Sequence, residues 1–186
     1  MKFDDIPLVV WFASLLFCCI ASVAMGESAP APEGAWRLEL NNGMGIYSGA
    51  CDRDGDYMLT GVVEYEKPLS GRLALGLRLM PLFVYEQEGR GEDTLYGGGG
   101  GLALRMYSVK NEYRGLFGEL SAHALGHSND IQGNDSHLNF LSGLGIGYQF
   151  DNPWSLSLKY DHISNAGLGG RNSGVNTLAL GVGYRF

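Results

Sequence analysis

The sequence predicts an all-β fold, an eight-stranded antiparallel transmembrane β-barrel of the outer membrane. From Gly34 onward the 186-residue chain alternates apolar and polar residues with period two, which is typical of half-buried strands. The alternating segments run about ten residues, the length that a tilted strand needs to cross a bilayer. Short turns between them alternate with longer polar loops, as in outer-membrane barrels. Outer-membrane barrels of this kind have an even number of strands, and a barrel of about eight strands has an interior that side chains can fill.

The composition of the chain excludes several classes of protein. Charged residues make up 18% of the chain, Gly accounts for 29 positions and the mean hydropathy is −0.03. Such a mean hydropathy does not fit a bundle of transmembrane helices, and a formal charge of −7 leaves no basic surface for nucleic acid. The sequence has neither a Gly-x-Gly-x-x-Gly nor a Gly-x-x-x-x-Gly-Lys pattern, which argues against a nucleotide enzyme.

The N-terminus carries the features of an export signal. Residues 6–25 form a long apolar run, IPLVVWFASLLFCCIASVAM, and its Ser22-Val23-Ala24 fits a small-x-small cleavage site. A Pro-rich acidic stretch follows the run, whereas a membrane anchor is more often followed by a basic flank. A single transmembrane anchor is the alternative, because about 20 apolar residues can span a bilayer. We expect a signal peptide at 1–24, a short N-terminal segment at 25–35 and the barrel at 36–186.

The first four strands follow from apolar residues that recur at every second position and therefore share one face. We predict that this face contacts lipid in each strand. The sets are Trp36, Leu38, Leu40, Met44 and Ile46 in segment 36–46; Tyr57, Leu59, Val63 and Tyr65 in 57–66; Leu73, Leu75, Leu77, Leu79, Phe83 and Tyr85 in 72–85; and Leu102, Leu104 and Met106 in 96–107.

The last four strands follow from the same pattern, and the chain ends on an aromatic residue, as exported outer-membrane barrels often do. The apolar sets are Leu116 and Leu120 in 113–124; Leu138, Phe140, Leu144, Ile146, Tyr148 and Phe150 in 138–150; Trp154, Leu156, Leu158 and Tyr160 in 154–161; and Leu178, Leu180, Val182, Tyr184 and Phe186 in 178–186. The short turns are KPLSG, SVKNE and FDNP, and the longer loops lie near 47–56, 86–95, 124–137 and 163–176.

The opposite face of these strands carries charges of both signs. The set is Arg37, Glu39, Glu64, Glu66, Arg72, Arg78, Arg105, Glu119, Lys159, Asp161 and Arg185. Inside a narrow barrel such charges must form ion pairs or hydrogen bonds, so we expect a plug of salt bridges rather than a conducting pore. A soluble lipocalin-like barrel or sandwich is the alternative fold. The glycine content, the aliphatic face with aromatic ends and the C-terminal aromatic residue favour the membrane barrel.

Polar residues interrupt the apolar register where the seventh and eighth strands reach the long loops. The outward parity of Leu156, Leu158 and Tyr160 continues to His162 and Ser164, and that of the eighth strand runs back to Asn176. Polar groups on a lipid-facing register suggest a functional site, although a strand that has reached the headgroup level would carry them too. A His and a Ser two residues apart on one strand share a face, with Cβ atoms about 7 Å apart, which is the minimum for a base-activated serine nucleophile.

A longer motif around these residues resembles a known family. The stretch His162-Ile163-Ser164-Asn165-Ala166-Gly167, then Asn172-x-Gly174, then a last strand ending Tyr184-Arg185-Phe186, looks like the signature of the PagL lipid A 3-O-deacylase family. The resemblance implies an outer-membrane barrel that hydrolyses the ester-linked 3-hydroxyacyl chain at position 3 of lipid A, at the outer leaflet. It also implies Ser164 as nucleophile and His162 as general base. Asn165 and Gly167 would belong to the loop that supplies the oxyanion hole, and Asn172 and Gly174 would shape the return to the last strand.

One position departs from the family pattern. The characterised enzymes of the family place a Glu fourteen residues after the His, where this chain has Asn176. An amide oxygen can accept a hydrogen bond from the imidazole and fix its tautomer, as in Cys-His-Asn sites. It cannot offset the positive charge that forms on the imidazole during proton transfer, so we expect slower acylation.

Other polar clusters lack the spacing of a site. His123, His127 and His137 do not form a ligand-spaced pair on one element, and Asp52, Asp54 and Asp56 lack the Glu that would complete a calcium loop. We therefore expect no metal and no cofactor. The expected partners are lipid A or lipopolysaccharide and outer-membrane lipid, without nucleic acid, and a homodimer is left open. The alternative functions are a non-enzymatic OmpX-like barrel acting in adhesion or envelope integrity, and an esterase for another acylated lipid.

Overall fold

The computed structural model describes residues 34–46, 51–88 and 94–186. The expected signal peptide at 1–24 lies outside the described residues, as does the segment 25–35 except for its last two residues. No helix among the described residues is long and apolar enough to cross a membrane.

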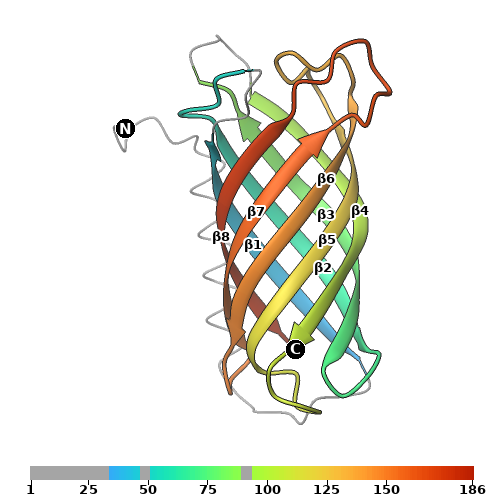
Figure 1. The fold of residues 1–186 in the computed structure, drawn as a ribbon, viewed down its shortest axis with the longest axis vertical. Coiled ribbons are helices and arrows are strands. Elements are labelled where there is room, and N and C mark those ends of the chain that lie inside the picture. The colour runs from blue at the N-terminus through green and yellow to red at the C-terminus, as the bar shows by residue number, and fades with distance from the viewer. Residues whose placement is uncertain (1–33, 47–50, 89–93) are drawn as a thin grey trace.

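Eight antiparallel strands form one closed barrel in which each strand pairs with its neighbours in sequence, and the last strand pairs with the first (Figure 1). The strands are β1 (Ala35–Ile46), β2 (Tyr57–Pro68), β3 (Leu73–Glu86), β4 (Thr94–Tyr107), β5 (Gly115–His127), β6 (Leu138–Gln149), β7 (Trp154–Ser164) and β8 (Val175–Arg185). Closure leaves no unpaired strand edge, and the predicted fold class is confirmed.

The two ends of the barrel differ in the length of their connections. At one end, here called the turn end, residues 69–72 join β2 to β3, residues 108–114 join β4 to β5, and residues 150–153 join β6 to β7. At the other, the long-loop end, the connections are 47–56, 87–93, 128–137 and 165–174. Figure 1 shows the 128–137 and 165–174 loops rising together above the same end of the barrel.

The outer wall of the barrel is apolar, and the predicted outward register is confirmed for most strands. Leu77, Leu144 and Leu180 expose 64%, 60% and 68% of their surface. Such exposure on every strand suits contact with lipid rather than water. Near the turn end, aromatic rings pack in pairs, with ring centroids 5.2 Å apart for Tyr148–Phe150 and 4.9 Å apart for Trp154–Tyr184. These rings form part of an aromatic girdle of the kind found at membrane interfaces.

The half of the interior nearer the turn end is filled by an ionic network. Glu119 accepts from Arg78 at 2.8 Å, from Arg105 at 2.6 Å and from Lys159 at 2.9 Å. The same network includes Arg37, Glu39, Glu64, Glu66 and Arg185. The expected plug of salt bridges is therefore present. The placement of Arg72 was wrong, because it is exposed in the turn 69–72, outside the barrel.

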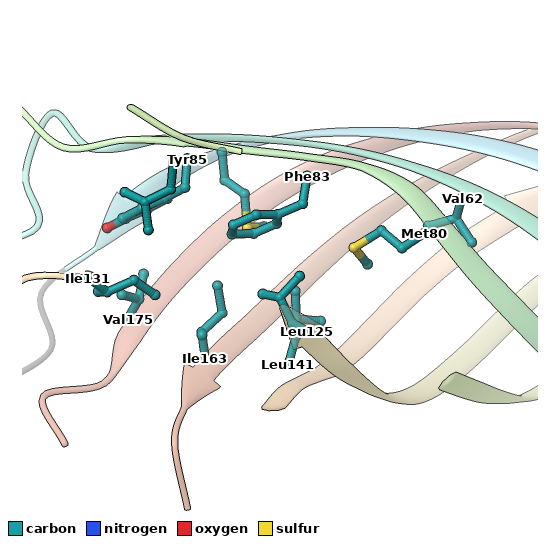
Figure 2. Close-up of a cluster of buried hydrophobic side chains, with 11 residues drawn as sticks. Val62, Met80, Phe83, Tyr85, Leu125, Ile131, Leu141, Ile163 and Val175 are labelled. Carbon is teal, nitrogen blue, oxygen red and sulfur yellow. The ribbon is translucent and has the colours of Figure 1, made fainter. Parts of the chain in front are cut away.

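The half of the interior nearer the long loops contains an apolar cluster, which the buried ion pair of Arg53 and Asp56 adjoins through Tyr85. The cluster's side chains, drawn in Figure 2, are Met58, Val62, Met80, Phe83, Tyr85, Leu95, Leu125, Ile131, Leu141, Ile163 and Val175. Ile131 reaches the cluster from the 128–137 loop, so part of a long loop packs inside the barrel mouth. This apolar cluster lies directly behind the strand ends that carry His162 and Ser164.

A β-bulge in β3 explains why Phe83 and Tyr85 belong to this interior cluster, against the predicted lipid-facing position. The β2–β3 register shifts between the pairs Gly61–Leu82 and Val63–Leu79, which leaves Met80 and Pro81 opposite a single residue of β2. One extra residue reverses the inward and outward parity for the rest of the strand. Proline lacks the N–H that a regular ladder needs, so it is accommodated at such a bulge.

Candidate active site

Three polar side chains occupy the outward register at the long-loop end of β7 and β8. His162 and Ser164 continue the exposed row of Leu156, Leu158 and Tyr160, and each is half-buried. Asn176, in the outward register of β8, pairs across the ladder with His162. The strand periodicity therefore places the three side chains on the outer wall, as predicted.

The imidazole of His162 is held by an amide. His162 Nδ1 lies 2.7 Å from Asn176 Oδ1. Because an amide oxygen only accepts hydrogen bonds, Nδ1 carries the proton and Nε2 keeps its lone pair. That tautomer leaves Nε2 able to take a proton from a neighbouring hydroxyl, which is the requirement for a general base.

Gly174 gives the imidazole its space. A Cβ built on Gly174 would lie 2.7 Å from His162 Cε1, closer than two such atoms can approach. Gly174 comes one residue before Val175, which pairs with Ile163, so it is level with Ser164. His162 Cε1 therefore lies against Gly174 on β8, at the level of the Ser164–Gly174 pair.

The loop after Ser164 turns sharply around one buried asparagine. Asn165 Oδ1 accepts from the Gly167 N–H at 2.9 Å, and the Asn165 N–H donates to Asn172 Oδ1 at 2.9 Å. Ala166 and Gly167 follow in the left-handed region, with φ of 51° and 83°. Glycine adopts that conformation at little cost, whereas it is uncommon for alanine. The four predicted loop residues Asn165, Gly167, Asn172 and Gly174 thus shape one tight return from β7 to β8.

The neighbouring 128–137 loop anchors this return. Asn165 Nδ2 donates to Asn134 Oδ1 at 3.0 Å, and Asn134 Nδ2 donates in turn to Asn139 Oδ1 at 2.7 Å. Asn134, Asn139 and Asn165 are all fully buried. On the surface, Arg171 Nη2 lies 2.7 Å from Asp135 Oδ1, and this hydrogen-bonded guanidinium lowers the pKa of the Asp135 carboxyl. The pair is therefore charged at neutral pH.

Two of the remaining histidines, His127 and His137, make structural contacts. His127 Nδ1 lies 2.8 Å from Asn129 O, and its Nε2 lies 2.7 Å from Asn139 Nδ2, so both ring nitrogens are bonded. His137 Nε2 lies 3.1 Å from Asp130 Oδ1 at the surface. Within the part of the chain that the structure describes, His, Cys, Asp and Glu side chains do not form a group of three that could hold a metal ion.

One polar residue beside His162 escaped the sequence analysis. Ser142 lies in the outward register of β6 and pairs directly with His162 across the β6–β7 ladder. Its neighbours in that register, Phe140 and Leu144, are 40% and 60% exposed. The signal that could have identified it is the interruption of an otherwise apolar row, LxFxSxLxI, at the position facing His162.

Together, the inverted polarity and the closed eight-stranded sheet define a transmembrane β-barrel of the outer-membrane class, with a polar cluster on its lipid-facing wall. The family model described as lipid A 3-O-deacylase (PagL) matches residues 74–185, more than half of the chain. The chain belongs to this family, whose activity is lipid A deacylation. Among the curated proteins, none matches the chain in sequence.

Solved structures share the fold. The outer membrane enzyme PagL is 19% identical, with a TM-score of 0.62 over 80% of this chain and 98% of that one. Neisserial surface protein A is 12% identical, with a TM-score of 0.52 over 83% and 98%. A de novo designed transmembrane β-barrel is 14% identical, with a TM-score of 0.50 over 85% and 100%. At these identities the likeness concerns the fold.

Proposed function

We propose that this protein is a serine esterase of the outer leaflet that removes the ester-linked 3-hydroxyacyl chain from position 3 of lipid A. The observation that carries the proposal is the hydrogen bond between His162 Nδ1 and Asn176 Oδ1, which prepares Nε2 as a base. Ser164 is two residues farther along the same face. Family membership supplies the substrate class, and the apolar wall around the cluster suits an acylated lipid that stays in the membrane.

In the proposed reaction, His162 Nε2 removes the proton from the Ser164 hydroxyl as Oγ attacks the ester carbonyl carbon. The tetrahedral intermediate collapses, and the protonated imidazole returns its proton to the sugar oxygen that leaves. Water, activated by the same imidazole, then hydrolyses the acyl-serine and releases a 3-hydroxy fatty acid. Asn176 keeps the Nδ1 proton in place through both steps. The loop 165–174 shapes the wall where the carbonyl oxygen becomes negative.

The long-loop end faces the cell exterior in the topology of outer-membrane barrels, which have short periplasmic turns and longer extracellular loops. In that orientation His162 and Ser164 meet the outer leaflet, where lipid A resides. This location explains a polar cluster at the upper limit of an apolar wall, because the ester bonds of lipid A join its apolar chains to its polar sugars.

The proposal is tested with the protein folded in detergent micelles and supplied with lipid A that carries a 3-hydroxyacyl ester at position 3. We expect release of the free 3-hydroxy fatty acid by the wild type. Ser164→Ala and His162→Gln should each lower kcat by at least about 10³-fold, because a nucleophile and its base act as one unit. Ser157→Ala, which removes a hydroxyl from the inward face of the same strand, is the matched control and should keep full activity. Equal activity of Ser164→Ala and the wild type would refute the assignment.

A further inference from the structure

The outward row of β6 consists of apolar and aromatic residues except for one serine, Ser142. Ser142 is exposed on the lipid-facing wall, flanked in its register by Phe140 and Leu144. A polar group on that wall without a good partner is unfavourable, because hydrocarbon offers it no hydrogen bond. Among the described residues, the Ser142 hydroxyl donates only to His162 O, at 3.5 Å, which is the outer limit of a hydrogen bond.

A second polar residue in the outward register shows how such a group is otherwise satisfied. Asn42 on β1 is also exposed on the wall, and its Nδ2 donates to the hydroxyl of Tyr57 on the adjacent strand. Asn42 therefore has a partner within the protein. Ser142 has no comparably short contact among the described residues, so its hydroxyl can turn toward a bound ligand.

The ladder places Ser142 in one straight row with the two residues of the base. Ser142 pairs with His162 across β6–β7, and His162 pairs with Asn176 across β7–β8. Directly opposed residues have Cβ atoms about 5 Å apart. His162 is thus flanked by the amide that fixes its Nδ1 proton on one side and by the weakly hydrogen-bonded hydroxyl of Ser142 on the other.

The same ladder sets Ser142 diagonally from the proposed nucleophile. Ser164 pairs with Phe140, two residues before Ser142. Diagonal neighbours of this kind lie about 7 Å apart, which leaves room for one carbonyl group between two hydroxyls that each approach it to about 3 Å. The imidazole lies against Asn176 and Gly174 of β8, on the side of β7 away from Ser142, so it leaves that space open.

We propose that Ser142 is a further catalytic residue of the esterase site, whose hydroxyl donates a hydrogen bond to the carbonyl oxygen of the lipid ester. This inference rests on the proposed function. As Ser164 Oγ bonds to the carbonyl carbon, the π electrons of the carbonyl move onto its oxygen, and the Ser142 O–H stabilises that negative charge. The charge returns to the carbon–oxygen double bond when the sugar oxygen leaves. The Ser142 proton is not transferred in either step.

The test compares three variants in detergent micelles with lipid A bearing a 3-hydroxyacyl ester at position 3. We expect Ser142→Ala to lower kcat by about 10²-fold or more with little change in KM, as the loss of an oxyanion donor does. Ser142→Thr keeps the hydroxyl on a residue that suits a strand and should restore most of the activity. Ser157→Ala serves as the control for removing a strand hydroxyl.

A serine-directed fluorophosphonate probe separates this inference from the alternatives. Covalent labelling should persist in Ser142→Ala and vanish in Ser164→Ala, because Ser142 is not the nucleophile. Unchanged kcat in Ser142→Ala, or labelling of Ser142 in place of Ser164, would overturn the inference while leaving an active esterase. A folded wild-type barrel that neither releases acid nor reacts with the probe would instead overturn the proposed function itself.

Discussion

At the scale of single residues, the proposed chemistry depends on how the imidazole of His162 is held. Asn176 accepts from Nδ1 of His162, and the absence of a side chain at Gly174 leaves space for the ring. Neither residue carries a charge, so in the proposed reaction the imidazolium would be stabilised by orientation alone. A carboxylate in the place of Asn176 would add an electrostatic contribution of the kind that the Ser-His-Asp triad uses.

Replacement of Asn176 by glutamate tests this reasoning. We expect Asn176→Glu to raise kcat about tenfold or more, because a carboxylate stabilises the imidazolium that an amide leaves uncompensated. Asn176→Ala, which loses the acceptor altogether, should lower kcat. If Asn176→Glu and Asn176→Ala were equally slow, the role of Asn176 as an orienting acceptor would be excluded.

At the scale of strands and loops, the position of the site follows from the alternation of the sequence. The period-two pattern placed His162, Ser164 and Asn176 on the outer wall, and the structure confirms this placement. The reversal of β3 after Met80 could not be derived from alternation, because Phe83 and Tyr85 are as apolar as lipid-facing residues. Pro81, which cannot donate to a regular ladder, was the local signal that the register would change.

The contact between the two long loops is a second feature that the sequence could not provide. Asn134 and Asn165 are 31 residues apart, and they meet only because β5, β6, β7 and β8 are consecutive in the barrel. Asparagine is common in solvated loops, so its presence there did not indicate burial. In the structure, Asn134, Asn139 and Asn165 form a chain of buried amides that ends at the turn next to Ser164.

Truncation of the middle amide tests what this chain does. We expect Asn134→Ala to lower kcat about tenfold, because Asn139 and Asn165 each lose a partner and the 165–174 loop loosens; an unpaired buried polar group costs about 1–3 kcal/mol. Hydrogen exchange in residues 165–174 should become faster, while the thermal midpoint of the barrel changes little, since loops open separately from the sheet. Unchanged exchange in this loop would contradict the anchoring role.

The surface ion pair between the same loops gives the comparison. Asp135 has a lowered pKa because of Arg171, so the pair is present above the ordinary carboxyl range and is lost as the pH falls through the lowered value. The amide chain does not titrate. Asp135→Asn should therefore have a much smaller effect than Asn134→Ala on kcat at neutral pH, as expected for an exposed pair.

At the scale of the whole molecule, the barrel combines a lipid-facing wall with a filled interior of two halves. The ionic network occupies the half near the turns, and the apolar cluster drawn in Figure 2, which includes Ile163 between His162 and Ser164, lies toward the long loops. Charges buried together are stable only as a complete set, since each depends on its neighbours for compensation. The interior therefore supports the wall on which the proposed chemistry takes place.

Removal of one member of the network tests its contribution to stability. Glu119 contacts Arg78, Arg105 and Lys159, so Glu119→Ala leaves three buried cations short of compensation. We expect a loss of about 3–5 kcal/mol in the free energy of unfolding, measured by urea titration of the folded barrel. Glu112→Ala, which removes an exposed partner of Arg114 at the turn end, should leave the urea midpoint almost unchanged. Equal midpoints for the two variants would show that the interior charges are not coupled.

The most direct test of the central claim is mass spectrometry of lipid A from Gram-negative cells that express this protein or its Ser164→Ala variant. We predict that the wild type removes one 3-hydroxyacyl group from position 3. The Ser164→Ala variant, folded and present in the outer membrane, should leave lipid A intact. Identical lipid A spectra from cells with the two folded proteins would contradict the assignment of Ser164 as the nucleophile of a lipid A deacylase.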